Sequence, residues 1–201
     1  MYHIFLQPFD AIDAIKKGST RAFAIMLFLA SGLGALAVTL MLQNSEMMTK
    51  GPMKWMPVFA ELNTLQLFLV LLVGIYVGNI VRACFLHIVM KIFTDKGAYS
   101  DAFKISSTTA YIGSVYLLLI IILGAIPVAG LGLAVLGVLL TMITVMAVCL
   151  RGIATMYKTD VITASLAIGI IMFASMIALH MGVFGAKWEL HMSNYEMMGE
   201  F

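Results

Sequence analysis

Five long apolar runs, separated by short segments that hold almost all of the charged residues, dominate this sequence. Only 11% of the residues are charged, whereas soluble domains carry about 25%. Roughly 20 apolar residues in a helix cross a bilayer core of about 30 Å, and lipid leaves the backbone no partners outside its own helix. The pattern therefore predicts an all-α polytopic membrane helix bundle. The predicted spans cover residues 22–42, 65–85, 108–126, 131–150 and 161–185.

Lysine and arginine residues are divided unevenly between the two sides of this five-span arrangement. Nine lie in the N-terminal flank, the second loop and the fourth loop, and three lie on the other side. The positive-inside rule places the richer side in the cytoplasm, with the N-terminus cytoplasmic and the C-terminus outside. We expect an amphipathic interfacial helix over 1–20, a five-helix membrane domain over 21–186 and an outer tail over 187–201.

Local signals refine these elements. The second apolar run continues as a helical pattern to residue 93, and residues 94–97 then stop it. Small residues four positions apart let helix backbones approach closely in lipid, as Gly74 with Gly78 and Ser165 with Gly169 would do. Packing within the bundle is the interpretation that we favour for these pairs, and a homo-oligomer contact remains open.

Arg82 is the most prominent polar residue within a span. It can reach back to the lipid phosphates, or it can pair with Asp101 or Asp160 from the inner loops. No acidic residue lies deep in a span, and no signature of a nucleotide, metal or nucleophilic active site occurs. We therefore expect no enzyme activity, no catalytic residues, no cofactor and no nucleic-acid partner.

Two further classes of function stay open. A small transporter or channel subunit could line a path with polar side chains, although such hydroxyls usually bond their own helix backbone. An outward copper(I) site could use methionine thioethers, which are soft ligands. The candidate path residues are Asn79, Thr108, Thr109, Ser114, Thr141 and Thr144, and the candidate copper ligands are Met47, Met48, Met197, Met198 and His191.

The segment from Phe85 to Tyr111 and the turn Ile126-Pro127-Val128-Ala129-Gly130 resemble the Yip domain family of five-span membrane proteins. In that family a helix end with a histidine leads to a glycine-centred turn, then to a third span that carries a tyrosine. Here these features are His87, Gly97 and Tyr111. The long cytosolic N-terminal region of eukaryotic members is absent, so the resemblance is to the prokaryotic type and implies the cytoplasmic (inner) membrane.

The resemblance implies a non-enzymatic scaffold or adaptor. We expect the loop 91–104 to face a cytoplasmic or membrane protein partner, or the lipid headgroups, with no catalytic residue. The predicted partner-binding or lipid-anchoring residues are Arg82, Lys91, Lys96, Asp101 and Lys104.

Overall fold

The computed structural model describes residues 11–44, 62–124, 126 and 130–177, and the regular secondary structure of these residues is entirely helical. A short helix α2 (Ala11–Lys17) precedes four long ones, which are α3 (Thr20–Asn44), α6 (Thr64–Phe93), α7 (Tyr99–Gly124) and α8 (Gly130–Met156). All four are long and apolar enough to cross a membrane, and a shorter apolar helix, Val161–Ile177, follows. The described residues therefore form an all-α bundle, which is consistent with the predicted membrane helix bundle. The fifth span and the orientation of the termini stay predictions.

Local polar residues set the ends of α6. The Asn63 side chain accepts a hydrogen bond from the N–H of Gln66 (2.9 Å), and the Gln66 side chain accepts one from the N–H of Asn63 (3.1 Å). This reciprocal capping box satisfies backbone donors that the first helical turn leaves free. At the other end, α6 stops at Phe93 because Thr94 is extended, which agrees with the stop predicted at residues 94–97.

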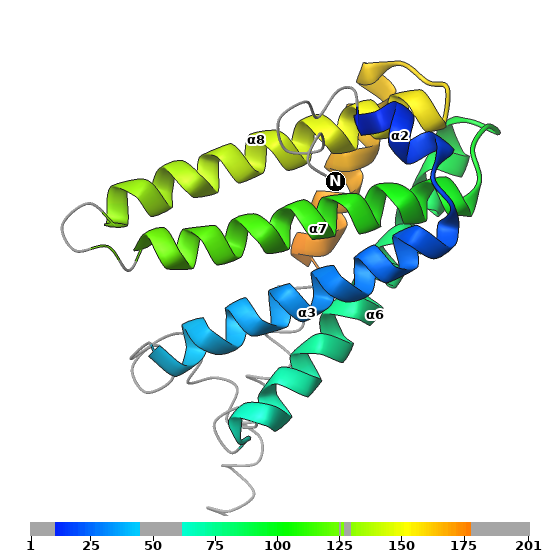
Figure 1. Ribbon diagram of the computed structural model, residues 1–201. Coiled ribbons are helices and arrows are strands. Elements are labelled where there is room, and N and C mark those ends of the chain that lie inside the picture. Colours follow the sequence, from blue (N-terminus) through cyan, green and yellow to red (C-terminus); the bar gives the residue numbers. More distant parts are fainter. Residues whose placement is uncertain (1–10, 45–61, 125, 127–129, 178–201) are drawn as a thin grey trace, which may run out of the picture.

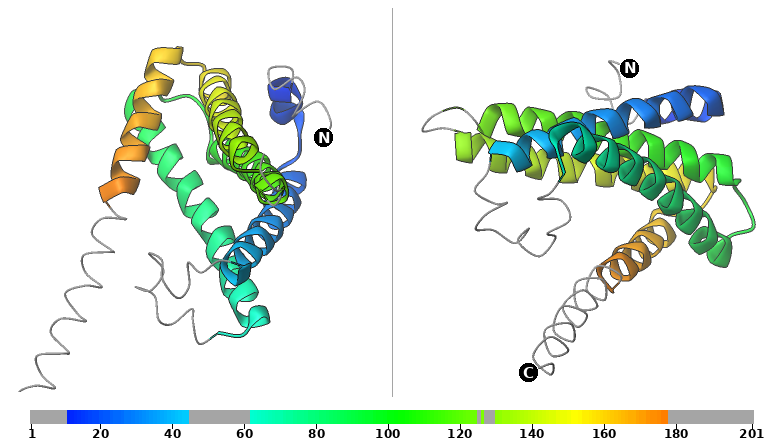
Figure 2. Two further views of the ribbon diagram at one scale, coloured as in Figure 1. Left: turned by 90° about the vertical axis from the view of Figure 1, so that its left-hand side faces the viewer. Right: turned by 90° about the horizontal axis from the view of Figure 1, so that it is seen from below.

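The centre of the bundle is α7, which packs against α3, α6 and α8, while α3 also packs against α6 (Figure 1). Between α7 and α8, the Ile126 carbonyl accepts a hydrogen bond from the N–H of Gly130 (2.9 Å). A Cβ at Gly130 would lie 2.4 Å from the Gly124 carbonyl oxygen, so only glycine fits there. The helix Val161–Ile177 begins near the end of α8 and runs at an angle to the other helices (Figure 2).

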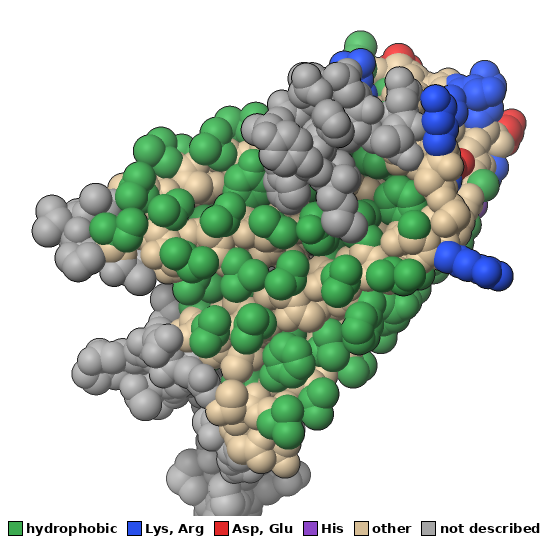
Figure 3. All heavy atoms as spheres, viewed as in Figure 1, with side chains coloured by type: hydrophobic (Ala, Val, Ile, Leu, Met, Phe, Trp, Pro, Cys, Tyr) green, Lys and Arg blue, Asp and Glu red, His purple; other side chains and the backbone are tan. Residues whose placement is uncertain are grey.

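The packed core lies towards one end of the bundle. Its buried side chains come from α2, the first turns of α3 and α7, the C-terminal parts of α6 and α8, and the helix Val161–Ile177. They include Leu27, Met90, Ile105 and Ile153. Lysine and arginine side chains gather at this same end, which we call the charged end (Figure 3). Elsewhere α6 and α8 expose large apolar side chains, which is the expected surface of helices surrounded by lipid.

The small residues that the sequence predicts at helix contacts do not lie at such contacts in the described part of the bundle. Gly74, Gly78, Ser165 and Gly169 are all exposed, and a Cβ at any of the three glycines would meet no atom of the described residues within 4 Å. Packing of these residues within the described part of the bundle is therefore not observed. The reason is that α6 turns its other faces towards α3 and α7. A contact with another molecule stays a prediction.

Close helix approach occurs instead at two other glycines. A Cβ at Gly34 of α3 would lie 3.1 Å from the Ser114 hydroxyl of α7. One at Gly137 of α8 would lie 2.8 Å from the Ile120 side chain of α7. Both contacts bring a neighbouring helix onto α7, in agreement with its central position.

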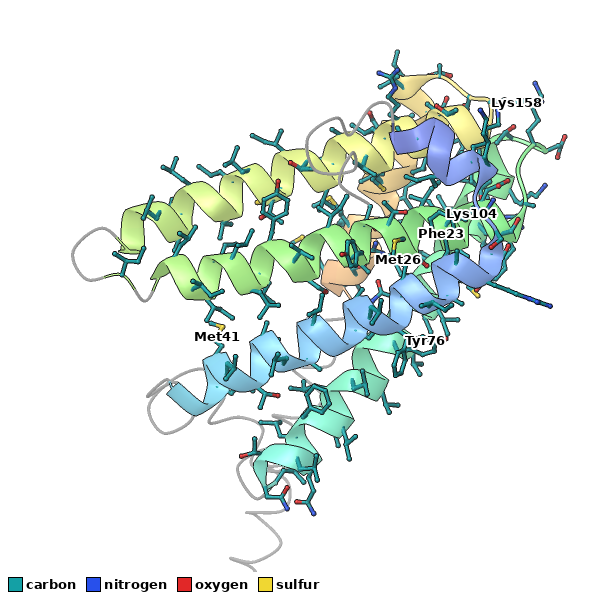
Figure 4. The ribbon with its side chains drawn as sticks, viewed as in Figure 1. Phe23, Met26, Met41, Tyr76, Lys104 and Lys158 are labelled. Atoms are coloured by element: carbon teal, nitrogen blue, oxygen red, sulfur yellow. The ribbon has the colours of Figure 1, made fainter. Side chains whose placement is uncertain are left out.

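The short helix α2 docks on the protein. Ile12 and Ile15 are buried in the core, and α2 packs against the ends of α7 and α8. The Lys104 ammonium group donates to the Lys16 carbonyl (3.2 Å) and lies 6.0 Å from the centre of the Phe23 ring (Figure 4). A cation suits this position because the last carbonyls of a helix lack partners and carry partial negative charge.

This arrangement corrects the prediction for Lys104. Its side chain is only 9% exposed, so it fastens α2 to α7 and cannot serve as a surface anchor for a partner or for lipid.

Replacing Lys104 with methionine should loosen α2 while keeping most of the buried volume. The Lys16 carbonyl would lose its charged donor, which costs about 1–3 kcal/mol. We expect faster hydrogen exchange at the amides of α2, with the exchange of α7 little changed. The matched control is Lys91→Met, which removes an exposed lysine of α6. Equal protection of α2 in both variants would contradict the fastening role of Lys104.

Candidate functional site at the charged end

Two loops meet at the charged end. The first loop (residues 94–98) joins α6 to α7, and the second loop (residues 157–160) joins α8 to the helix Val161–Ile177. The two loops are far apart in sequence, but the packing of α6, α7 and α8 brings them together. Their contact defines the candidate site.

Gly97 of the first loop lies against the ring of Tyr157. Gly97 has φ of +81°, a left-handed conformation that side chains disfavour, and a Cβ there would lie 2.4 Å from the ring. Tyr157 is fully buried. Backbone conformation and space therefore both require glycine at position 97.

Aromatic rings extend this contact into α6 and α7. His87 Nδ1 and the Tyr157 hydroxyl are 3.0 Å apart and share a hydrogen bond. The His87 ring also meets the Tyr99 ring edge to face, at 6.2 Å between ring centres. Burial, and to a lesser degree the negative charge of Asp101, raise the pKa of Tyr157, so the phenol keeps its proton at neutral pH. The phenol can therefore donate to a neutral His87 ring.

Hydrogen bonds hold the backbone of the first loop at both ends. The Lys91 ammonium group donates to the Asp95 carbonyl (2.7 Å), and the N–H of Lys96 donates to the Thr94 hydroxyl (3.2 Å). The Asp101 carboxylate accepts from the N–H of Ala98 (2.9 Å) and so caps the start of α7. Lys96 itself is exposed. The loop is thus fixed while its surface remains accessible.

The second loop is built from two helix caps. Lys158 has φ of +49°, and the N–H of Thr159 donates to the Ala154 carbonyl (3.0 Å), which ends α8 in a Schellman-type turn. The Asp160 carboxylate then accepts from the N–H and from the hydroxyl of Thr163, at 2.8 Å each. These bonds lower the pKa of Asp160. Lys158 points outward at the charged end (Figure 4).

Arg82 lies deeper in the bundle than the two loops. Its guanidinium group donates to the Ser106 carbonyl (3.4 Å) and to the Thr109 hydroxyl, both on α7. The Ser106 hydroxyl in turn donates to the Asn79 carbonyl of α6 (3.0 Å). The sequence left two alternatives for Arg82, which were contact with lipid phosphates and pairing with Asp101 or Asp160. The structure does not show the pairing, because both carboxylates cap helices instead.

The predicted site residues thus separate into three groups. Lys91 and Lys96 lie at the accessible surface, Arg82 extends from α6 to bond α7, and Asp101 and Lys104 hold other parts of the chain in place. Tyr157 was not predicted. Its position after an apolar run fits a lipid interface as well as a packed core, so the sequence offers no signal that distinguishes the two.

Most candidate path residues use their polar groups inside the helices. Asn79, Thr108, Thr109 and Thr141 each donate to a carbonyl of their own helix four residues earlier. Ser114 is buried at the contact with Gly34, and Thr144 is partly buried on α8. The candidate copper ligands lie outside the described residues. Within the described residues, no three His, Cys, Asp or Glu side chains form a group that could hold a metal ion.

Gly97→Ala should destabilise the charged end. The left-handed backbone costs a residue with a Cβ about 1–2 kcal/mol, and overpacking against the Tyr157 ring costs about 1–3 kcal/mol. We expect a lower unfolding temperature of the purified protein in detergent. The matched control is Gly132→Ala in α8, where a Cβ meets nothing within 4 Å and where alanine should be neutral or stabilising. An unfolding temperature equal to that of the wild type would contradict the Gly97 contact.

The Asp160 cap should make stability depend on pH in the acid range. The pKa of Asp160 is lower in the folded state than in the unfolded state. The stabilising contribution of the Asp160 cap is therefore fully present above the ordinary aspartate pKa of about 3.9, and it is lost as the pH falls through the folded-state pKa. We expect the difference in unfolding temperature between wild type and Asp160→Asn to be constant at neutral pH and to shrink in acid. Thr163→Val, which removes one donor, should reduce the acid dependence. A difference that is independent of pH would argue against the charged cap.

Comparison with protein-family models, curated proteins and solved structures finds no match for this chain. Membership of the Yip domain family therefore stays a prediction that rests on the sequence pattern.

Proposed function

We propose that this protein is a non-enzymatic membrane scaffold of the Yip type, which presents the first loop and the adjoining second loop to a protein partner on the cytoplasmic side. The observation that supports this most is the way the first loop is held. Gly97 lies on the Tyr157 ring, and bonds at both ends fix the backbone between them. A loop that is already ordered loses little conformational entropy when a partner binds.

The exposed residues of the two loops suggest what kind of partner fits. Lys96 and Lys158 offer cations, while Asp95 and Asp160 offer carboxylates on the same end. A surface with both signs of charge can be matched by a protein with a complementary pattern. Anionic lipid headgroups would be attracted by the lysines and repelled by the aspartates. This mixture supports a protein partner more than a lipid anchor.

Photocrosslinking in native membranes tests this proposal. A photoreactive amino acid placed at position 96 should yield a discrete crosslinked protein, because the loop is accessible and fixed. The same amino acid at Val135, an exposed apolar position of α8, should yield lipid adducts. Lys158→Glu should weaken the protein crosslink from position 96 because it reverses a neighbouring charge, whereas Arg21→Glu at the start of α3 should leave it unchanged.

The outcomes separate the alternatives. Lipid adducts alone at position 96 would show that the loop anchors to headgroups and would contradict the scaffold proposal. A crosslink that survives Lys158→Glu would remove the second loop from the proposed surface.

A further inference from the structure

Arg82 is the only residue with a permanent charge in the 27-residue stretch from Thr64 to Met90. It lies about three helical turns before the end of α6, and its partners on α7 lie about two to three turns after the start of that helix. Arg82 therefore lies below the loops and about one helical turn inside the end of the span predicted over residues 65–85. A cation there is costly unless something compensates its charge.

The structure holds the guanidinium group in place without neutralising it. A guanidinium carries five N–H donors, yet both hydrogen bonds of Arg82 come from one terminal nitrogen. Both acceptors, the Ser106 carbonyl and the Thr109 hydroxyl, are uncharged. In the part of the chain that the structure describes, no carboxylate accepts from Arg82. The group is therefore oriented by α7 and keeps donors to spare.

The open side of Arg82 is available to lipid. The Arg82 side chain is exposed, and on the same stretch of α6 the apolar side chains of Val81 and Ile88 are each 59% exposed. Because no described carboxylate pairs with Arg82, an anion from the headgroup layer is well placed to compensate its charge. The anion present there is the phosphate of a phospholipid, and its oxygens match the paired N–H groups of a guanidinium.

We propose that Arg82 binds the phosphate group of a phospholipid from the leaflet at the charged end, seated beside the contact between α6 and α7. Unlike a side chain that merely extends to the surface, Arg82 is fixed by Ser106 and Thr109, so the lipid occupies a defined position. This site is independent of the proposed protein partner, because it lies on a different part of the molecule.

Solid-state NMR on the full-length protein in phospholipid vesicles tests the contact directly. The chain has three arginines, so Arg21→Lys with Arg151→Lys leaves Arg82 as the only one. With ¹³C at the guanidinium carbon and phosphate-free buffer, dipolar recoupling between ¹³C and ³¹P should reveal a lipid phosphate in direct contact. Absence of recoupling would overturn the proposal. Recoupling that appears only after inorganic phosphate is added would assign the site to the free anion and overturn the lipid assignment.

Variants test whether the contact is a defined site. In native mass spectrometry of detergent-solubilised protein with added phosphatidylglycerol, Arg82→Gln should reduce lipid retention at least tenfold. Thr109→Val should reduce it to a smaller degree because the guanidinium is less well oriented. The matched control, Arg21→Gln, removes an exposed arginine and should retain lipid as the wild type does. Equal losses in Arg82→Gln and Arg21→Gln would show general charge attraction and would contradict a defined site.

Discussion

The Tyr157 ring, held between the Gly97 backbone and the His87 side chain, is the contact on which the charged end of this bundle depends. It joins the end of α8 to the end of α6 and the first loop, from which α8 is separated in the chain by the whole of α7. A fully buried phenol needs a hydrogen-bond partner, and His87 supplies it. Because the ring occupies the space that a side chain at position 97 would need, the two loops fix each other.

The first half of α7 shows how a membrane helix can be polar and still pack closely. Ser106, Ser107, Thr108 and Thr109 follow one another and are all buried. Their hydroxyls donate to carbonyls of α6 or of α7 itself, so little hydrogen-bonding capacity is left unused. Small side chains also let the neighbouring helices approach, which drives association where lipid removes the hydrophobic term. The polar run thus organises the centre of the bundle and orients Arg82.

Much of the fold follows from the sequence alone, because lipid imposes a strict length and polarity on each spanning helix. The four long helices and the stop after Phe93 are therefore readable in the chain. The partners of individual side chains are not readable, because they depend on which helices become neighbours. In the sequence, nothing distinguishes Lys104 from a surface lysine of a loop; only the packing of α2 beside it shows its role. Gly74 and Gly78 have the spacing of a packing contact, but only the structure shows that α6 turns them outward.

The position of the core has a consequence for the bilayer itself. The side chains of the core cluster come from the charged end, and α6 and α8 diverge from one another towards the opposite end (Figure 1). The described long helices therefore form a taper that is narrower at the charged end than at the opposite end. A bundle that widens from one leaflet to the other displaces unequal areas of the two leaflets, and unequal displacement is what couples an inserted protein to bilayer curvature.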